Sequence, residues 1–475
     1  MTIAGESRDG QGAVALALRG TDVEEVALGA DRYTVYLREL LARTIAATPA
    51  TDLSVLGQLR TAAIAIAQEL AWPSTRDEAW RFTNLAAMMA FEFGPTVAIA
   101  ADQLGGADPQ AIALAECPAA RLVFVNGYFC EILSDLSAVP AGVTVERLAT
   151  ADLSAAALGA HLGKVQNGSE PFAALNTAAI ADGAVVRVAR NAIIETPIQI
   201  LFLAVPGPTP ALIQPRVLVV AEEGSACTLI EDYALAQGSW CQGSIAAATE
   251  PYFTNGVTEI AIADNARINH SRIQREAANA FHIGKTAVLQ GRDSYYGLTT
   301  ISTGAAIARH NLDITQGGPG TETRLQGLTV AAGTQIADLH SDLNLQHPHG
   351  VADQLHKCIA ANRGRTVFNG RVLVGQKAQH TDAAQLNRNL LLSSQARVDT
   401  KPQLEIIADD VKCTHGATVS QLEDDEIFYL RSRGLDSTSA RRLLLDGFGG
   451  EILAQLPAAS LRSQLARCLA CELEF

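Results

Sequence analysis

Hydrophobic positions along the chain change their spacing twice. From Asp31, apolar residues recur every three or four positions, which predicts two amphipathic helices, the second of them ended by Pro73. A strand-like spacing begins at Arg121, and the helical spacing returns after Gln421. The buried stripes expected for the first two helices are Tyr33, Leu37, Leu40, Leu41 and Ile45, and then Leu59, Ala63, Ile66 and Leu70.

The middle of the chain is a long series of short apolar and β-branched runs separated by Gly, Asn, Asp and Ser. Just before it, the turn dipeptide Asn126-Gly127 predicts a hairpin. So many short strands suit either a β-sandwich or a parallel β-helix, in which each coil stacks on the one before. We favour the β-helix, because about 240 residues of strand are too many for one sandwich.

These spacings predict a mainly β protein with a parallel β-helix core and helical regions on both sides. The predicted parts are a mostly helical region at 1–120, a mixed α/β lead-in at 121–181, the β-helix core at 182–421 and a helical domain at 422–475.

Composition narrows the function classes. The net charge of -14 argues against a nucleic-acid-binding protein and against a surface that seeks anionic membrane. No run of about 18 apolar residues predicts a membrane span. The polar N-terminus lacks the pattern of a signal peptide, so we expect a cytoplasmic protein whose eight cysteines are reduced thiols.

Several familiar catalytic motifs are absent from the sequence, so the enzyme classes that use them are set aside. There is no phosphate-binding loop of the type G-x-x-x-x-G-K-[ST] and no G-x-S-x-G elbow. Gly317-Gly-Pro-Gly is not a dinucleotide fingerprint, because Pro319 removes a backbone donor and no helix follows. The segment from Arg76 to Asn84, with Trp80 and Phe82, is expected to be a structural clasp.

The candidate chemistry centres on Cys413 and His415. In an extended strand, side chains two positions apart point to the same face, and thiolate and imidazole are good ligands for iron, zinc and copper(I). Two ligands do not make a complete site, and a buried thiol beside a hydrogen-bonded histidine is the structural alternative. A helix is predicted directly after this strand, with acidic residues from Asp424 at its start and Gly434 at its stop.

Two further groups could bind metal. Five possible ligands fall within nineteen positions, although a solvated His-rich loop is the plainer interpretation. The pair Cys468 and Cys471 has the C-x-x-C spacing, but on a helix without a second pair it favours packing. The five clustered residues are His340, His347, His349, His356 and Cys358.

Several segments match one family pattern. They are Glu78-Ala-Trp-Arg-Phe-Thr, Leu122-Val-Phe-Val-Asn-Gly, Ala174-Leu-Asn-Thr-Ala, Asn389-Leu-Leu-Leu-Ser, Thr400-Lys-Pro-Gln-Leu-Glu-Ile, Ala408-Asp-Asp-Val-Lys-Cys-Thr-His-Gly-Ala-Thr-Val and Ile427-Phe-Tyr-Leu-Arg-Ser-Arg-Gly-Leu. Together they resemble the SufB/SufD family of scaffold subunits in the SUF machinery for iron–sulfur cluster assembly, and in particular its SufD type.

The resemblance implies a right-handed parallel β-helix between helical ends. It implies pairing with a SufB-like subunit, or with a second copy when SufB is missing, and binding of a SufC-like ABC-type ATPase by the C-terminal helices. No cofactor would be tightly bound to the isolated chain. Iron or a nascent cluster would sit transiently at the partner interface, where His415, with Cys413, would take part. The docking candidates are Phe428, Tyr429, Arg431 and Arg433.

Two features favour the SufD type over the SufB type. Gly416, where SufB-type chains typically carry Glu, precedes Ala417-Thr418, and Lys377-Ala378 lacks the upstream cysteine of the SufB pattern. The alternatives are a SufB-like cluster scaffold, a β-helix enzyme acting on polysaccharide, and a stand-alone metal-binding protein that uses the set from His340 to Cys358. Few aromatics and no export signal argue against the polysaccharide enzyme.

Overall fold

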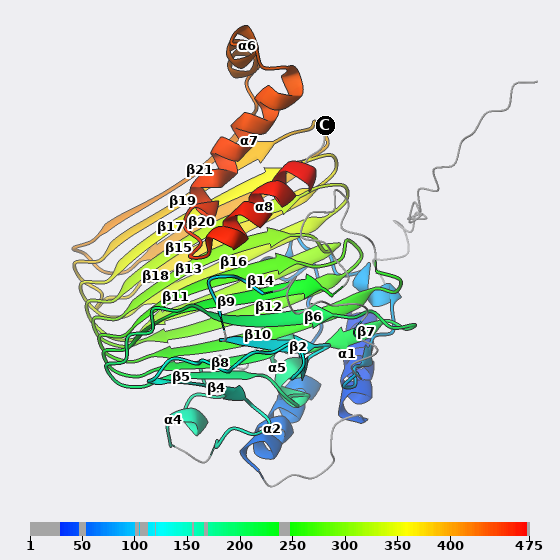
Figure 1. Cartoon of the computed structure of the whole chain (residues 1–475), viewed down its shortest axis with the longest axis vertical. Coiled ribbons are helices and arrows are strands. Elements are labelled where there is room, and N and C mark those ends of the chain that lie inside the picture. Colours follow the sequence, from blue (N-terminus) through cyan, green and yellow to red (C-terminus); the bar gives the residue numbers. More distant parts are fainter. Residues whose placement is uncertain are drawn as a thin grey trace, which may run out of the picture.

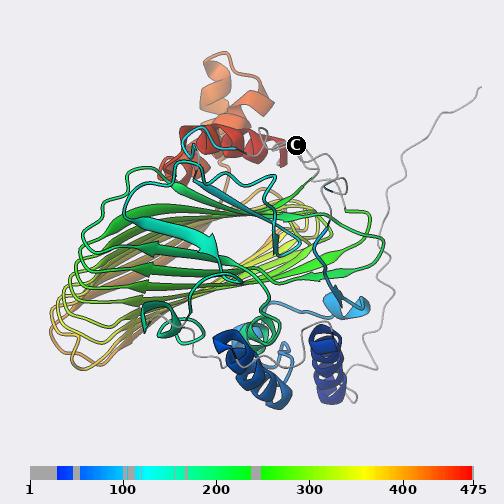
Figure 2. The same ribbon diagram turned by 60° about the horizontal axis from the view of Figure 1, so that its bottom comes forward.

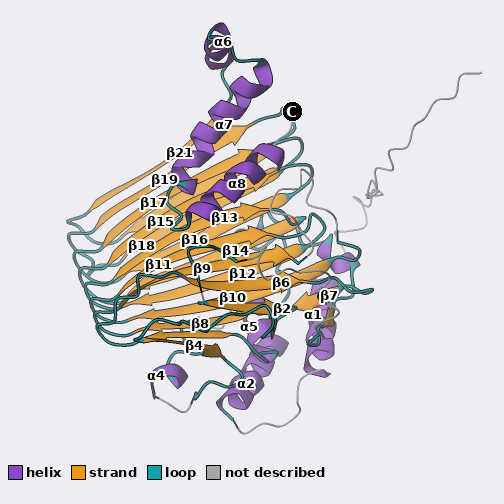
Figure 3. Cartoon of the chain, in the orientation of Figure 1, coloured by secondary structure: helices purple, strands orange, loops and turns teal. Residues whose placement is uncertain are grey.

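The chain folds as a parallel β-helix with helices at both ends, as its hydrophobic spacing predicts (Figure 1). In the part that this computed structural model describes, two sheets of 11 and 10 strands form the walls. From Arg216 onward, successive strands alternate between the sheets, so the chain winds around a common interior (Figure 3). The described residues are 29–46, 54–99, 104, 113–118, 120–153, 156–165, 170–236 and 248–472.

The two sheets are named A and B here. Sheet A contains β1 (Gly94–Pro95), β4 (Val143–Arg147), β5 (Ala184–Val188), β7 (Ala211–Ile213), β8 (Arg216–Ala221), β10 (Tyr252–Ile262), β12 (Phe281–Gln290), β14 (Ile307–Gln316), β16 (Ile336–Leu345), β18 (Arg365–Val374) and β20 (Arg397–Ile406). Sheet B contains β2 (Arg121–Val125), β3 (Tyr128–Phe129), β6 (Ile198–Ala204), β9 (Ala226–Leu235), β11 (Arg267–Arg275), β13 (Tyr295–Thr303), β15 (Glu322–Ala331), β17 (Val351–Ala360), β19 (Asp382–Leu391) and β21 (Lys412–Gln421).

The helices lie before and after the main series of parallel strands in the sequence. They are α1 (Gly29–Ala46), α2 (Val55–Glu69), α4 (Ala156–Gly159), α5 (Pro171–Ala178), α6 (Asp424–Ser432), α7 (Ser437–Leu453) and α8 (Ala459–Glu472), with short 3-10 turns at Glu78–Trp80 and Met88–Ala90.

The coils differ in length although their strands do not. The strands β12, β14, β16, β18 and β20 each have 10 residues. Paired positions are 26 residues apart between Phe281 and Ile307 but 32 apart between Arg365 and Arg397. The variation therefore lies in the turns, which hides the repeat from a search for a fixed period.

The interior between the sheets, which we call the lumen, is apolar along one strip. Ile268 and Tyr296 of sheet B meet Val288, Ile314 and Leu343 of sheet A there, and all five are buried. Burial of such side chains contributes about 25 cal/mol for each Å² of apolar surface, so this strip supplies much of the stability of the stacked coils.

The rest of the lumen is polar, and its side chains pair across the two sheets. Arg272 Nη2 of β11 lies 2.5 Å from His282 Nε2 of β12, whose Nδ1 lies 2.5 Å from Glu276. All three side chains are buried. A Cβ on Gly284 would lie 2.3 Å from Arg272 Nη2, so a glycine leaves the space that the guanidinium occupies. The lumen is thus filled by paired polar groups for which small neighbours make room.

Antiparallel pairing and helices close the N-terminal end of the β-helix, which Figure 2 brings forward. β3 turns back on β2 through Asn126 (φ 52°) and Gly127 (φ 87°), so the predicted hairpin is confirmed. On α1, Leu37, Leu40 and Leu41 are buried, as expected.

The predicted stripe on α2 is wrong at one position. Ile66 is 41% exposed, whereas Ala63 and Ala67 are buried together with Leu56. The small side chains share a cluster with Ala174, Leu175 and Ala178 of α5. Close approach of two helices favours the alanine face over the face that carries the larger isoleucine.

The segment from Arg76 to Asn84 clasps the outer wall of sheet A, as predicted. The Arg309 guanidinium carbon lies 3.7 Å from the centre of the buried Trp80 ring. Arg309 donates to Asp338 at 2.7 Å, and the Thr83 hydroxyl donates to the same carboxylate. Burial alone would raise the pKa of Asp338, but the charge of Arg309, aided by His340 and the hydrogen bonds, lowers it to about 2.

The C-terminal helices α7 and α8 lie on the outer face of sheet B. Leu445, Ile452 and Leu461 pack there against Leu328 and Ile359. The shorter α6 extends away from the body beyond the last coil (Figure 1). The predicted start and end of α6 are confirmed. Its first turn contains acidic residues, and Gly434, with φ 99°, follows the helix.

Replacing the buried carboxylate of the clasp should destabilise the fold strongly. In Asp338→Ala, the Arg309 side chain, 2% exposed, loses its buried charge partner. We expect a loss of about 3–5 kcal/mol in the free energy of unfolding at pH 7, measured by urea titration. Because the folded pKa of Asp338 is lowered, its contribution is present above about pH 4 and disappears toward pH 2, where variant and wild type should converge.

Lys401→Ala is the matched control within the same clasp. Lys401 pairs with the exposed Glu78, and exposed ion pairs contribute little. The urea midpoint of this variant should stay near that of the wild type. Equal destabilisation by the two variants would contradict the role assigned to the buried pair.

Candidate functional site

In the part of the chain that the structure describes, no further coil stacks on the last coil of the β-helix. Among the described strands, β20 pairs in sheet A only with β18, and β21 pairs in sheet B only with β19. No residue of β21 is buried. Ile406, Ile407 and Val419 expose 45%, 59% and 52% of their surface. Long exposed strand edges with apolar side chains are templates for pairing with another chain.

Cys413 and His415 lie on this open strand, and their positions face the lumen. Cys413 pairs in register with the buried Ala383 and packs against the luminal core. His415 pairs in register with the buried Gln385. Cys413 is half-buried while His415 is exposed. The structure therefore places the two predicted ligands on one face at the open end of the lumen.

The Cys413 thiol is held in its neutral form. Partial burial raises its pKa, the charge of Asp382 adds to this, and a backbone hydrogen bond from Ala383 opposes it. Since the thiolate is the nucleophile and the metal ligand, Cys413 needs a metal ion or a neighbouring base to become active.

The four docking candidates lie on the exposed helix α6 or at its C-terminal cap. Phe428 and Tyr429 expose 71% and 57% of their surface, and Ile427 is the buried anchor of the helix. Arg431 and Arg433 are exposed, and the Arg433 guanidinium lies 5.2 Å from the Tyr429 ring centre. Two adjacent exposed aromatic side chains beside arginines are typical of a protein-binding surface.

The set from His340 to Cys358 does not come together. His340 lies on the outer wall, 3.2 Å from Asp338 Oδ1. His356 and Cys358 lie in the lumen, where burial lowers the pKa of His356 to about 3 and raises the pKa of Cys358 to about 12. Ligands that are close in sequence are thus separated, because they lie on different sheets and on opposite faces, outer and luminal.

The other two histidines of that set lie in the turn after β16. His347 is half-buried, and His349 (φ 63°) stacks on His380 with ring centres 5.0 Å apart. His380 in turn lies 2.9 Å from the Asp410 carboxylate. Across the described residues, no group of three or more His, Cys, Asp or Glu side chains could hold a metal ion.

The cysteine pair near the C-terminus is only partly within the described side chains. Cys468 is buried on α8, which agrees with packing. The side chain of Cys471 lies outside the described residues, as does Cys241.

Two luminal amides beneath the last coil were missed by the sequence analysis. Gln385 and Asn389 on β19 are buried, and their side-chain oxygens have no hydrogen-bond partner. Gln385 lies directly below His415 and Asn389 below Val419. Only the register between coils could have identified them, and that register depends on turn lengths.

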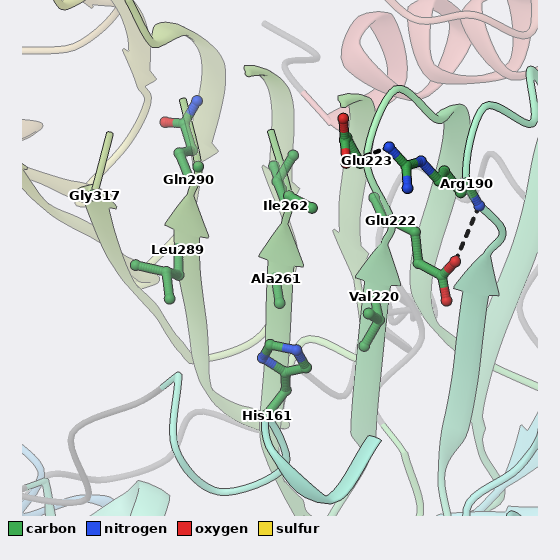
Figure 4. Close-up of a pocket in the computed structure, with 13 residues that line it drawn as sticks. His161, Arg190, Val220, Glu222, Glu223, Ala261, Ile262, Leu289, Gln290 and Gly317 are labelled. Atoms are coloured by element: carbon green, nitrogen blue, oxygen red, sulfur yellow. Dashed lines mark hydrogen bonds and ion pairs between the residues drawn. The ribbon is translucent and has the colours of Figure 1, made fainter. Parts of the chain in front are cut away.

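A cavity of about 470 Å³ lies far from this end, against the first complete coils (Figure 4). Val220, Ala261 and Leu289 of sheet A form its apolar floor. At its rim, Arg190 pairs with Glu223 at 2.9 Å. Burial lowers the pKa of His161, the other rim base. Among the described residues that line this cavity, Arg190 is thus paired with Glu223, and burial disfavours the charged form of His161.

Comparison with known protein families identifies two matching regions. Residues 205–448 match the family described as the SufBD core domain of the SUF system for FeS cluster assembly. Residues 34–200 match the SufBD protein N-terminal region.

Similar curated proteins cover most of the chain. An iron–sulfur cluster assembly SufBD family protein of Synechocystis is 45% identical over 89% of this chain and 92% of its own length. The chloroplastic protein ABCI7 of Arabidopsis thaliana is 34% identical over 91% of this chain and 89% of its own length. The iron–sulfur cluster assembly protein SufD of Escherichia coli is 31% identical over 83% of this chain and 87% of its own length.

Thiol labelling should distinguish the open coil from the filled lumen. At neutral pH, iodoacetamide should modify Cys413 more slowly than a free thiol, with a rate that rises with pH, because its pKa is raised. Cys358, which is 1% exposed, is the control and should react only after denaturation. Peptide mass spectrometry over time measures both. Labelling of Cys358 as fast as Cys413 in the folded chain would show that the lumen is open.

Proposed function

The chain belongs to the SufBD family of iron–sulfur cluster assembly proteins, and we propose that it acts there as a SufD-type scaffold subunit without catalytic activity of its own. The observation that supports this most is the open last coil, which carries Cys413 and His415 on a strand with one unpaired edge. The iron and sulfide are the cargo of such a scaffold. Assembly requires a partner, because this chain offers only part of a ligand set.

The partner that we propose for the last coil is a SufB-like subunit. Strands β20 and β21 present two 10-residue edges at the open end of the β-helix, with Ile406, Ile407 and Val419 exposed beside them. Main-chain pairing along such edges gives affinity, and the apolar side chains add buried area. A second copy of this chain would fit the same edges when the SufB-like subunit is missing.

At this interface His415 would bind iron or the nascent cluster, with Cys413 beside it. An exposed imidazole on an open strand can donate its lone pair to a metal that the partner also holds. The raised pKa of Cys413 gives the thiol a supporting role until metal binding removes its proton. Either side chain alone would release the cargo readily, which suits a transient site.

The C-terminal helices would bind a SufC-like ABC-type ATPase. α7 and α8 are anchored on sheet B, whereas α6 carries Phe428 and Tyr429 into solvent next to the last strand. Motion of the ATPase would thereby reach the coil that holds His415. The lack of a phosphate-binding loop in this chain agrees with ATP hydrolysis by the partner.

The other candidate functions have less support. A SufB-type role is disfavoured by the missing upstream thiol and by the similarity to a protein named SufD. A polysaccharide-active enzyme does not agree with membership of this family. None of the described helices is long and apolar enough to cross a membrane. A cytoplasmic location remains a prediction, since one relative is named as chloroplastic.

Removing the proposed ligand should abolish assembly on the complex. His415→Ala, co-purified with SufB-like and SufC-like subunits, should lower the amount of cluster formed by about tenfold or more, because His415 is the one histidine in β20 and β21. Cluster absorbance after reconstitution with iron and sulfide measures this. The control is His380→Ala, an exposed histidine on a nearby turn, which should assemble normally. Undiminished assembly by an intact His415→Ala complex would remove His415 from the proposal.

Truncating the exposed aromatics of α6 should weaken ATPase binding. Phe428→Ala with Tyr429→Ala removes two adjacent exposed rings, and hot-spot aromatics contribute about 2 kcal/mol or more each, at least a thirtyfold change in Kd. Calorimetric titration with the SufC-like subunit measures this. Ile132→Ala, equally exposed at the opposite end, should leave binding unchanged. Unchanged affinity of the double variant would place the ATPase contact elsewhere.

A further inference from the structure

A chain of polar side chains runs along the lumen toward the last coil. Ser341 of β16, Gln354 of β17 and Gln385 of β19 are all buried, with 2–3% exposure. Gln385 Nε2 donates to Gln354 Oε1 at 2.9 Å, and Gln354 Nε2 donates to Ser341 Oγ at 2.9 Å. Each amide nitrogen therefore donates away from the open end. The carbonyl oxygen of Gln385 is left at the end of the chain without a partner.

One side chain above Gln385 can supply the missing donor. The positions of β21 on the luminal face are Cys413, His415, Ala417, Val419 and Gln421, in register with β19. Two of these side chains carry an N–H group, and His415 is the register partner of Gln385, whereas Gln421 is that of Leu391, six positions further along the strand. Neighbouring strands are about 4.8 Å apart, so an imidazole and a glutamine amide in adjacent register can reach one another by side-chain rotation.

The opposite wall of the lumen makes room for this amide. A Cβ on Gly370 of β18 would lie 2.3 Å from Gln385 Nε2 and 2.8 Å from Gln385 Cδ. Gly370 does not have a positive φ, so its backbone conformation does not require glycine. Glycine is disfavoured inside strands, and the space for the Gln385 side chain is the reason for it here.

We propose that Gln385 is a positioning residue for His415. Its Oε1 accepts a hydrogen bond from one ring N–H of His415, so that the other ring nitrogen presents its lone pair outward to iron or the nascent cluster. A neutral imidazole has one N–H and one lone pair, and an acceptor at one nitrogen fixes which is which. This inference rests on the proposed function of His415 but assigns a role to a different side chain.

Two substitutions separate the acceptor from the donor of Gln385. Gln385→Met removes both the carbonyl acceptor and the amide donor, whereas Gln385→Glu keeps an acceptor oxygen at the same place. If Gln385 only filled the lumen, or only donated to Gln354 through its amide N–H, the variants Gln385→Met and Gln385→Glu would behave alike. Gly370→Ala displaces the amide without changing Gln385 or His415. Thr400→Val is the control, because the Thr400 hydroxyl on β20 is another buried polar group without a hydrogen-bond partner.

The readout is the proton position on His415, followed in the full chain with ¹⁵N-labelled histidine. Ring ¹⁵N shifts identify the protonated nitrogen, and His415→Ala assigns the signal. We expect one tautomer to dominate in the wild type, in Gln385→Glu and in Thr400→Val, and a mixture in Gln385→Met and Gly370→Ala. The same tautomer population in Gln385→Met as in the wild type would overturn the proposal, whatever the assembly assay gives.

Cluster assembly on the complex separates this inference from the proposed function. Side chains that hydrogen-bond a metal-ligating histidine affect metal affinity or activity by about 10–100-fold, so Gln385→Met should lose about tenfold and Gln385→Glu should remain near the wild type. Equal losses in the two variants would show that only the amide donor matters and would overturn the positioning role. If His415→Ala abolishes assembly while Gln385→Met leaves it intact, the proposed function of His415 is supported and the positioning role of Gln385 is contradicted.

Discussion

Each coil of the β-helix pairs its backbone with the coil before it, so the last coil is left with two unpaired strand edges. At the N-terminal end, the hairpin at Asn126-Gly127 and the helices resolve the same problem. At the C-terminal end, β20 and β21 remain open in the part of the chain that the structure describes. Exposed edges of this length favour pairing with another chain, which agrees with the partner that we propose.

The same open coil explains why the candidate site is incomplete. Deeper in the lumen, polar side chains such as Arg272 and His282 find partners on the facing sheet. At the last coil the next layer is missing, so His415 is exposed and the Gln385 oxygen beneath it has no partner. The outward side of His415 would therefore be covered only by another layer, and we propose that a partner subunit supplies it.

Much of the architecture could be predicted from the sequence, because it depends on local signals. The hairpin at Asn126-Gly127 and the strand that places Cys413 beside His415 follow from turn chemistry and from the two-residue period. The pairing of coils could not be predicted, since the turns vary and the sequence separation between paired residues ranges from 26 for β12 with β14 to 41 for β8 with β10. Gln385 was therefore missed. For the same reason His340 and Cys358 were grouped by sequence, although they face opposite sides of the wall.

Hydrogen exchange of the backbone amides in β20 and β21, with and without the SufB-like partner, tests most directly whether the open coil is an interface. The account predicts that amides of these two strands, around Cys413 and His415, gain strong protection in the complex, while those of β16 and β17 stay unchanged. Equal exchange of β20 and β21 in the free chain and in the complex would contradict it, because the partner would then bind elsewhere.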